Sequence, residues 1–166
     1  MMQPTSLKTC ALIAVSAAAT MFLMQACGGG ANAQSPAPEA DPIEGVWEST
    51  VTIKDCTSGA VLTTFTGESL FHRGGTLTAD NSNPVPTRGL GMGTWTATGT
   101  GAYKAQFHFL RFNPDGTLAG SQKVVRSVTL AADAQSLTAT IAAQLLDTAG
   151  AVLRPICGTE TSVRVY

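Results

Sequence analysis

The chain has little charge of either sign and almost no histidine. Only 13% of its residues are charged, and its 10 basic residues do not outnumber its 11 acidic ones. Proteins that bind nucleic acid do so through clustered Lys and Arg, so this balance argues against a nucleic-acid partner. The two histidines, His72 and His108, have no close ligand spacing to each other or to a cysteine, so we expect no metal and no cofactor.

Motifs of catalysis are also missing. The chain has no Gly-x-Ser-x-Gly elbow, its carboxylates are scattered, and its glycine pairs fall in turns rather than in a phosphate loop. A nucleophile would need one of the two histidines as its base. His108 alternates onto a polar face. His72 beside Arg73-Gly74-Gly75 is the better candidate, although a structural role at the rim explains it as well. We therefore assign no catalytic residue.

Long apolar runs are absent except for one near the N-terminus. Lys8 precedes an uncharged apolar run from Ala11 to Met24. The run has about 14 residues, fewer than the roughly 20 that a membrane-spanning helix needs. A basic residue, a short apolar run and then small residues are typical of a secretory signal peptide. We expect residues 1–26 to be such a signal and the protein to be exported to a bacterial cell envelope.

Two cleavage sites compete at the end of this segment. Leu23-Met24-Gln25-Ala26-Cys27 resembles the bacterial lipobox, in which Cys27 carries lipid and residues 27–42 form a flexible tether. The rival is Ala31-Asn32-Ala33, a small-x-small site whose cleavage would release a soluble periplasmic or secreted protein. We favour lipidation, which predicts an outer-membrane lipoprotein facing the periplasm or the exterior. Its only contact with the membrane would be the lipid anchor.

Cysteine is scarce, with four in the chain. Cys10 lies in the signal and Cys27 would carry the lipid, which leaves Cys56 and Cys157 as an even pair in an oxidising compartment. We predict a disulfide between them. Closing a loop of about 100 residues is worth up to roughly 4.7 kcal/mol.

From Ile43 onward the apolar residues recur with the period of a β-strand rather than that of a helix. Turn residues separate the alternating stretches, and Pro84 and Pro86 exclude the long segment 80–91 from a central strand. The predicted strands span 46–54, 61–72, 76–79, 92–98, 102–112, 120–131, 136–147 and 159–166.

Consecutive strands joined mostly by short turns predict an all-β domain over residues 43–166, folded as a single antiparallel up-and-down eight-stranded barrel. An even number of strands lets the first and last close antiparallel. Closure would place Cys56 beside Cys157, and Trp47 near Val165 and Tyr166. A two-sheet β-sandwich would also hide the strand edges, and it stays as the alternative fold.

Gly45-Val46-Trp47 resembles the Gly-x-Trp opening of lipocalins, and Arg164 stands where calycin barrels often place an arginine over that tryptophan. The folded region is also similar to a group of small exported bacterial proteins of unassigned function. This similarity implies a lipocalin-like barrel and an exported address. It rests on Trp47, Asp55-Cys56, Phe71-His72-Arg73-Gly74-Gly75, Gly93-Thr94-Trp95 and Cys157.

Two arginines lie on predicted apolar faces. Arg126 alternates with Val124 and Val128, and Arg111 follows Phe109. An arginine inside a barrel must be paired, with Glu160, Glu44 or a C-terminal carboxylate, or must bind an anion, unless a register bulge turns it outward. In the functional interpretation, Arg126 and Arg111 anchor the acidic group of a small apolar ligand. The aromatic residues that could line its pocket are Trp95, Tyr103, Phe107 and Phe65.

The structural interpretation of the same residues is a paired arginine and an ordinary core, because small eight-stranded barrels are often filled by side chains. We expect a non-enzymatic cell-envelope lipoprotein that binds a small apolar or amphipathic ligand, or that contacts an envelope partner, for example through segment 80–91. The alternative is a lipocalin-like barrel enzyme of isomerase or cyclase type, which predicts that His72 or Arg126 faces a cavity.

Overall fold

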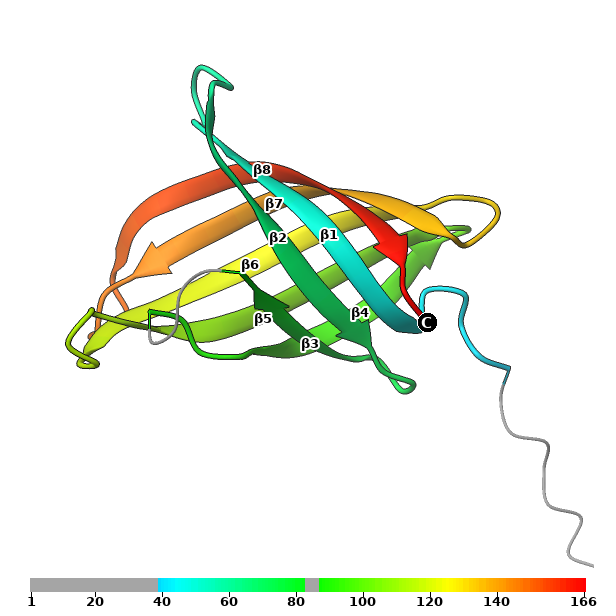
Figure 1. Ribbon diagram of the computed structural model, residues 1–166, viewed down its shortest axis with the longest axis horizontal. Helices are drawn as coiled ribbons and strands as arrows, with labels where there is room; N and C mark the ends of the chain where they lie inside the picture. Colours follow the sequence, from blue (N-terminus) through cyan, green and yellow to red (C-terminus); the bar gives the residue numbers. More distant parts are fainter. Residues whose placement is uncertain (1–38, 83–86) are drawn as a thin grey trace, which may run out of the picture. The chain divides into compact units, whose positions relative to one another are not determined.

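The protein is described by a computed structural model that covers residues 39–82 and 87–166. Within them every regular element is a β-strand. Each strand pairs antiparallel with the next and β8 pairs with β1, which closes the sheet into a barrel (Figure 1). The strands are β1 (Gly45–Lys54), β2 (Val61–Phe71), β3 (Thr76–Asn81), β4 (Gly91–Gly99), β5 (Ala102–Phe112), β6 (Leu118–Leu130), β7 (Ser136–Leu146) and β8 (Val152–Arg164).

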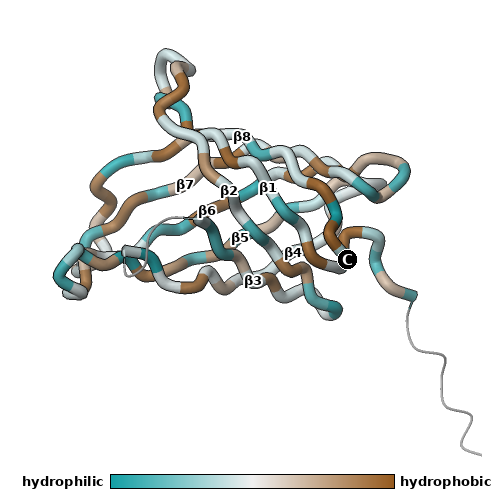
Figure 2. The backbone as a smooth tube through the Cα atoms, in the orientation of Figure 1, coloured by the Kyte–Doolittle hydropathy of each residue, from teal (hydrophilic) through white to brown (hydrophobic). Residues whose placement is uncertain are grey.

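The predicted eight-stranded up-and-down barrel is confirmed. The sandwich alternative is wrong, because the ring of strand pairings has no break that would divide it into two sheets. Alternation decides which side chains enter the interior, and Figure 2 shows it as changes of hydropathy along the strands. On β5, for example, Tyr103, Ala105 and Phe107 are buried while Lys104 and Gln106 are exposed. The predicted inward face of this strand is therefore confirmed.

Most strand bounds lie within two residues of the prediction, and the large exception is the start of the last strand. β8 begins at Val152 rather than at residue 159, so Cys157 lies inside the strand instead of before it. Pro155 is compatible with this longer strand because β1 pairs with β8 only from Cys157 onward, and a proline is tolerated where a strand has one partner. β3 extends to Asn81, which shortens the irregular segment predicted over 80–91.

The seam between β1 and β8 carries the disulfide. Lys54 pairs with Cys157, and the turn after β1 brings Cys56 within disulfide range, with a Cα–Cα distance of 5.2 Å. At the other end of the seam Trp47 pairs with Arg164. The predicted bond between Cys56 and Cys157 is therefore confirmed, and so is the expected approach of the two ends of the barrel domain.

Arg164 closes one end of the barrel. Its guanidinium lies 4.4 Å from the ring centroid of Trp47, as the resemblance to calycin barrels implied. Nε donates to the carbonyl oxygen of Ala134 at 2.8 Å, Nη1 donates to that of Glu44 at 2.7 Å, and Nη2 donates to that of Pro42. Three carbonyl acceptors and one aromatic face thus hold a single cation over the end of the core.

The segment before β1 covers the same end. Ile43 is fully buried, and its carbonyl oxygen accepts a hydrogen bond from the Trp47 indole at 2.9 Å. The Tyr103 hydroxyl donates to Asp41 at 2.7 Å. Burial, this hydrogen bond and the nearby carboxylate together raise the pKa of Tyr103 to about 12. Side chains therefore fill this end of the barrel, and the segment before β1 covers it.

Several predictions fall outside the described residues: the signal peptide 1–26, lipidation at Cys27, the alternative cut at Ala33, and most of the tether. Pro84 and Pro86 lie outside them as well. In the part of the chain that the structure describes, no helix is long and apolar enough to cross a membrane.

Candidate ligand site at the open end of the barrel

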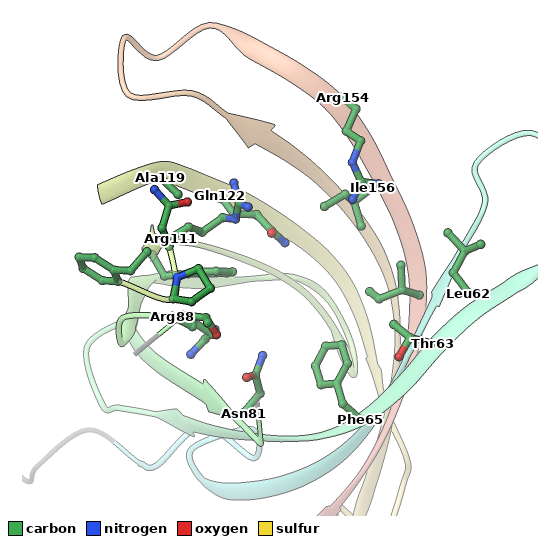
Figure 3. A pocket seen from close by; sticks show the side chains of 16 residues that line it. Leu62, Thr63, Phe65, Asn81, Arg88, Arg111, Ala119, Gln122, Arg154 and Ile156 are labelled. Atoms are coloured by element: carbon green, nitrogen blue, oxygen red, sulfur yellow. The ribbon is translucent and has the colours of Figure 1, made fainter. Parts of the chain in front are cut away.

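The end of the barrel opposite Trp47 holds a cavity of about 580 Å³ (Figure 3). It is formed by the end of β1, the start of β2, the ends of β3 and β5 and the starts of β6 and β8, together with residues just before β4 and just after β5. Its lining combines apolar side chains with cationic and amide groups. The apolar part includes Ile53, Leu62, Phe65, Phe109, Phe112 and Ile156, and the polar part includes Asn81, Arg88, Arg111, Gln122 and Arg154.

Arg88 lies at the inner side of this cavity and is already paired. Its side chain is 6% exposed, and Nη1 lies 2.7 Å from the carboxylate of Asp80. The guanidinium also donates to the carbonyl oxygen of Ala79 and packs 4.1 Å from the ring centroid of Phe109. Burial lowers the pKa of Arg88, an effect that Asp80 opposes and the nearby Arg126 reinforces. The charge of Arg88 is thus neutralised locally.

Arg111 and Arg154 differ from Arg88 because they lack an ionic partner. Arg111 is half-buried on β5 and Arg154 is exposed on β8. Among the described residues neither guanidinium has a hydrogen bond, an ion pair or an aromatic ring beneath it. Within the same residues no Asp or Glu lines the cavity. The cavity therefore carries two uncompensated positive charges.

A smaller chamber of about 50 Å³ lies further in, bordered by Arg88, Arg126, Gln122 and Phe107, among others. The Nε atoms of both arginines lack a well-aligned hydrogen-bond acceptor among the described residues. Apolar side chains such as Val51, Ile53 and Ile141 form most of the remaining wall, so the chamber is a small, mainly apolar space with two guanidiniums at its border. The interior therefore changes gradually from an open cavity to a filled core.

Arg126 itself is held by a buried network. Its Nε lies 3.1 Å from one oxygen of Glu160, close enough for an ion pair although not aligned as a hydrogen bond, and Nη1 donates to the other oxygen at 3.3 Å. Nη1 also donates to Ser69 at 2.9 Å. The hydroxyls of Ser49 and Ser162 donate to Glu160 at 2.9 and 3.0 Å. Burial lowers the pKa of Arg126 and Glu160 opposes that shift.

The six side chains predicted to bind a ligand are thus distributed over the whole barrel, and of these Phe65 lines both the large cavity and the inner chamber. Arg111 lines the large cavity, and Arg126 and Phe107 border the inner chamber, where the guanidinium lies 4.6 Å from the ring centroid. Trp95 and Tyr103 line neither space. They pack edge to face with a centroid distance of 5.9 Å and belong to the filled region. The structure therefore brings together only part of the predicted set.

The two histidines lie in different environments. His108 is exposed on the outer face of β5, as its alternation indicates. His72 is half-buried after β2, its Nε2 lies 2.9 Å from the Thr78 hydroxyl, and its carbonyl oxygen accepts from the Trp95 indole at 3.0 Å. It lines neither cavity. Of the two residues that the enzyme alternative places at a cavity, only Arg126 borders one, and its charge is paired.

Sequence reasoning missed four of the polar residues named for the cavity, and the first is Asn81, which fell in the segment predicted to be irregular. Gln122 shares the parity of Val124 and Arg126, so alternation alone could have placed it inside. Arg154 was overlooked because the last strand was predicted to begin after it. Arg88 belongs to the irregular segment before β4, where no periodicity indicates the direction of a side chain.

Within the described residues, no group of three or more His, Cys, Asp or Glu side chains is arranged to hold a metal ion. In comparisons with known proteins, no family model and no curated protein matches the chain. The geometry of the site therefore carries the inference about function.

Proposed function

We propose that this protein is a non-enzymatic binding module that holds a small amphipathic molecule in the cavity at the open end of its barrel. The observation that carries the proposal is the cavity of about 580 Å³, which combines apolar walls with a few polar groups. Small-molecule sites typically have volumes of about 300–1,000 Å³ and this kind of lining. A fully filled interior would have favoured a protein-interaction domain instead.

The proposed location is the bacterial cell envelope, reached by export and retained through lipid on Cys27. The disulfide between Cys56 and Cys157 supports export, because such bonds persist in oxidising compartments and are rare in the cytosol. Replacing Cys27 by Ala should abolish lipid labelling and release the protein in soluble form. If Cys27→Ala changes neither processing nor fractionation, cleavage at Ala33 explains the mature protein better.

Binding can be tested with phenylnaphthylamine, a neutral dye whose fluorescence rises in apolar surroundings. The dye should bind the purified protein with saturable fluorescence. Thr63 lines the cavity, while its neighbour Thr64 is absent from the lining. Thr63→Trp should therefore block binding by filling the cavity, and Thr64→Trp should leave binding unchanged. Absence of saturable binding, or equal loss in both variants, would contradict the proposed site.

A further inference from the structure

We infer that the cavity recognises an anionic head group, a carboxylate or a phosphate, between Arg111 and Arg154, and that the apolar part of the ligand points inward. This inference rests on the proposed function and specifies its ligand. Three of the six arginines in a chain that is only 13% charged line this one cavity. Within residues 39–82 and 87–166, Arg88 alone of these three has a carboxylate partner, so Arg111 and Arg154 are available to an anion.

The register of the strands shows how the polar side chains of the cavity are placed relative to one another. Phe109 on β5 lies opposite Gln122 on β6, Gln122 lies opposite Leu145 on β7, and Leu145 lies opposite Arg154 on β8. These four residues form one row across the sheet. Arg111 stands one inward-facing position further out on β5, opposite Gly120, which has no side chain to crowd it.

Both arginines line the same cavity, Arg154 within this row and Arg111 one inward-facing position beyond it. Three strand spacings of about 4.8 Å separate the strands of Arg111 and Arg154, which is about 14 Å along the curved sheet. Two long side chains can reach a common group across that distance, and Figure 3 shows both among the side chains at the cavity. Gln122 lies in the row between them and adds amide donors. A carboxylate or phosphate accepts hydrogen bonds from such groups.

The next row inward is apolar and gives the ligand its orientation. It consists of Phe107, Val124, Ala143 and Ile156, which lie opposite one another in that order and are all buried. The two guanidiniums are therefore at the outer level and the hydrocarbon walls are beneath them. Further in, the charge of Arg126 is matched by Glu160. An amphipathic anion is thus accommodated with its head at the mouth and its apolar part inside.

The test uses two dyes that share one aromatic frame. Anilinonaphthalene sulfonate carries an anionic group, and phenylnaphthylamine lacks it. Arg111→Gln and Arg154→Gln should each weaken binding of the sulfonate about tenfold and leave the neutral dye unchanged, because each removes one charge-assisted contact. Lys104→Gln is the control, since it removes the same charge from the exposed face of the strand that bears Arg111. It should affect neither dye.

Competition identifies the head group. Lauric acid, as its carboxylate, and lauryl phosphate should both displace the sulfonate dye better than lauryl alcohol, and the stronger of the two anions identifies the head group. Higher salt should weaken the binding of both anions and leave the binding of the alcohol unchanged. If the neutral dye binds and the arginine variants bind the sulfonate like the parent, the anionic inference is overturned while the proposed function stands. If neither dye binds, both are overturned.

Discussion

The buried pair of Arg126 and Glu160 allows a quantitative test of the interior. Both side chains are almost fully buried, at 8% and 2% exposure. Removing one partner of such a pair leaves an uncompensated buried charge, which costs about 3–5 kcal/mol. Glu160→Leu should therefore lower the free energy of unfolding by about 4–5 kcal/mol, because the remaining guanidinium keeps only Ser69 as an acceptor.

Arg126→Met should lower the free energy of unfolding by less, about 3 kcal/mol, at the low end of the same range. Glu160 would keep its two hydroxyl donors, and a buried carboxylate can take up a proton and become neutral. In the double variant both charges are gone. The Ser49 and Ser162 hydroxyls, 2.8 Å apart, would still bond to each other. The remaining loss of stability, about 1–2 kcal/mol, would come mainly from Ser69, which loses the hydrogen bond that Arg126 donates to it.

These values predict a coupling energy of about 5–7 kcal/mol in a double-mutant cycle, since the single costs sum to about 7–8 kcal/mol and the double variant costs about 1–2 kcal/mol. Urea unfolding followed by tryptophan fluorescence, with the disulfide intact, measures all four proteins. Glu160→Gln, which keeps a polar acceptor, is the milder variant if Glu160→Leu does not fold. Single costs below about 1 kcal/mol, or an additive double variant, would refute the assigned role of the pair.

Three further predictions concern the rest of the barrel. Replacing Cys56 and Cys157 together by Ala should lower the free energy of unfolding by about 3–4 kcal/mol in urea, and a loss below about 1 kcal/mol would contradict the calculation from loop length. Gly93→Ala should destabilise the barrel by about 1–3 kcal/mol or more, because the added Cβ would lie 1.9 Å from a carbonyl oxygen of β5; Gly99→Ala, whose nearest contact would be 3.7 Å away, should be close to neutral. The pKa of Tyr103 is raised from 10.0 to about 12, so its hydroxyl stabilises the fold fully below pH 10 and loses this effect as the pH approaches 12. The difference in Tm between the parent and Tyr103→Phe should therefore narrow over that interval, and a constant difference would count against it.

Much of the fold follows from local pattern. The alternation of Tyr103, Ala105 and Phe107 places each side chain because successive residues of a strand face opposite sides. The error at β8 has an equally local origin. Residues 152–158 combine exposed apolar side chains with Pro155 and lack clear alternation, so the strand was predicted to begin after them. Its first residues form a strand because β7 supplies a partner for them.

The candidate site could be predicted only in part. Parity correctly indicated that Arg126 lies inside, and the paired alternative with Glu160 is what the structure shows. Parity did not indicate that Arg126 is neutralised whereas Arg111 has no ionic partner among the described residues. The difference depends on which carboxylates reach each guanidinium, and those carboxylates come from other strands.

The sequence by itself indicated the order of the strands and the disulfide and favoured a closed barrel over a sandwich, because alternation, turn residues and an even strand number are properties that the chain carries locally. It also carries the features on which the proposed export rests. Only the tertiary structure decided which end is filled and which is open. Trp47 and Arg164 meet at one end because β1 pairs with β8, while the cavity at the other end depends on contacts among strands far apart in the chain. Arg111 and Arg154 come to line one cavity only when the barrel has closed.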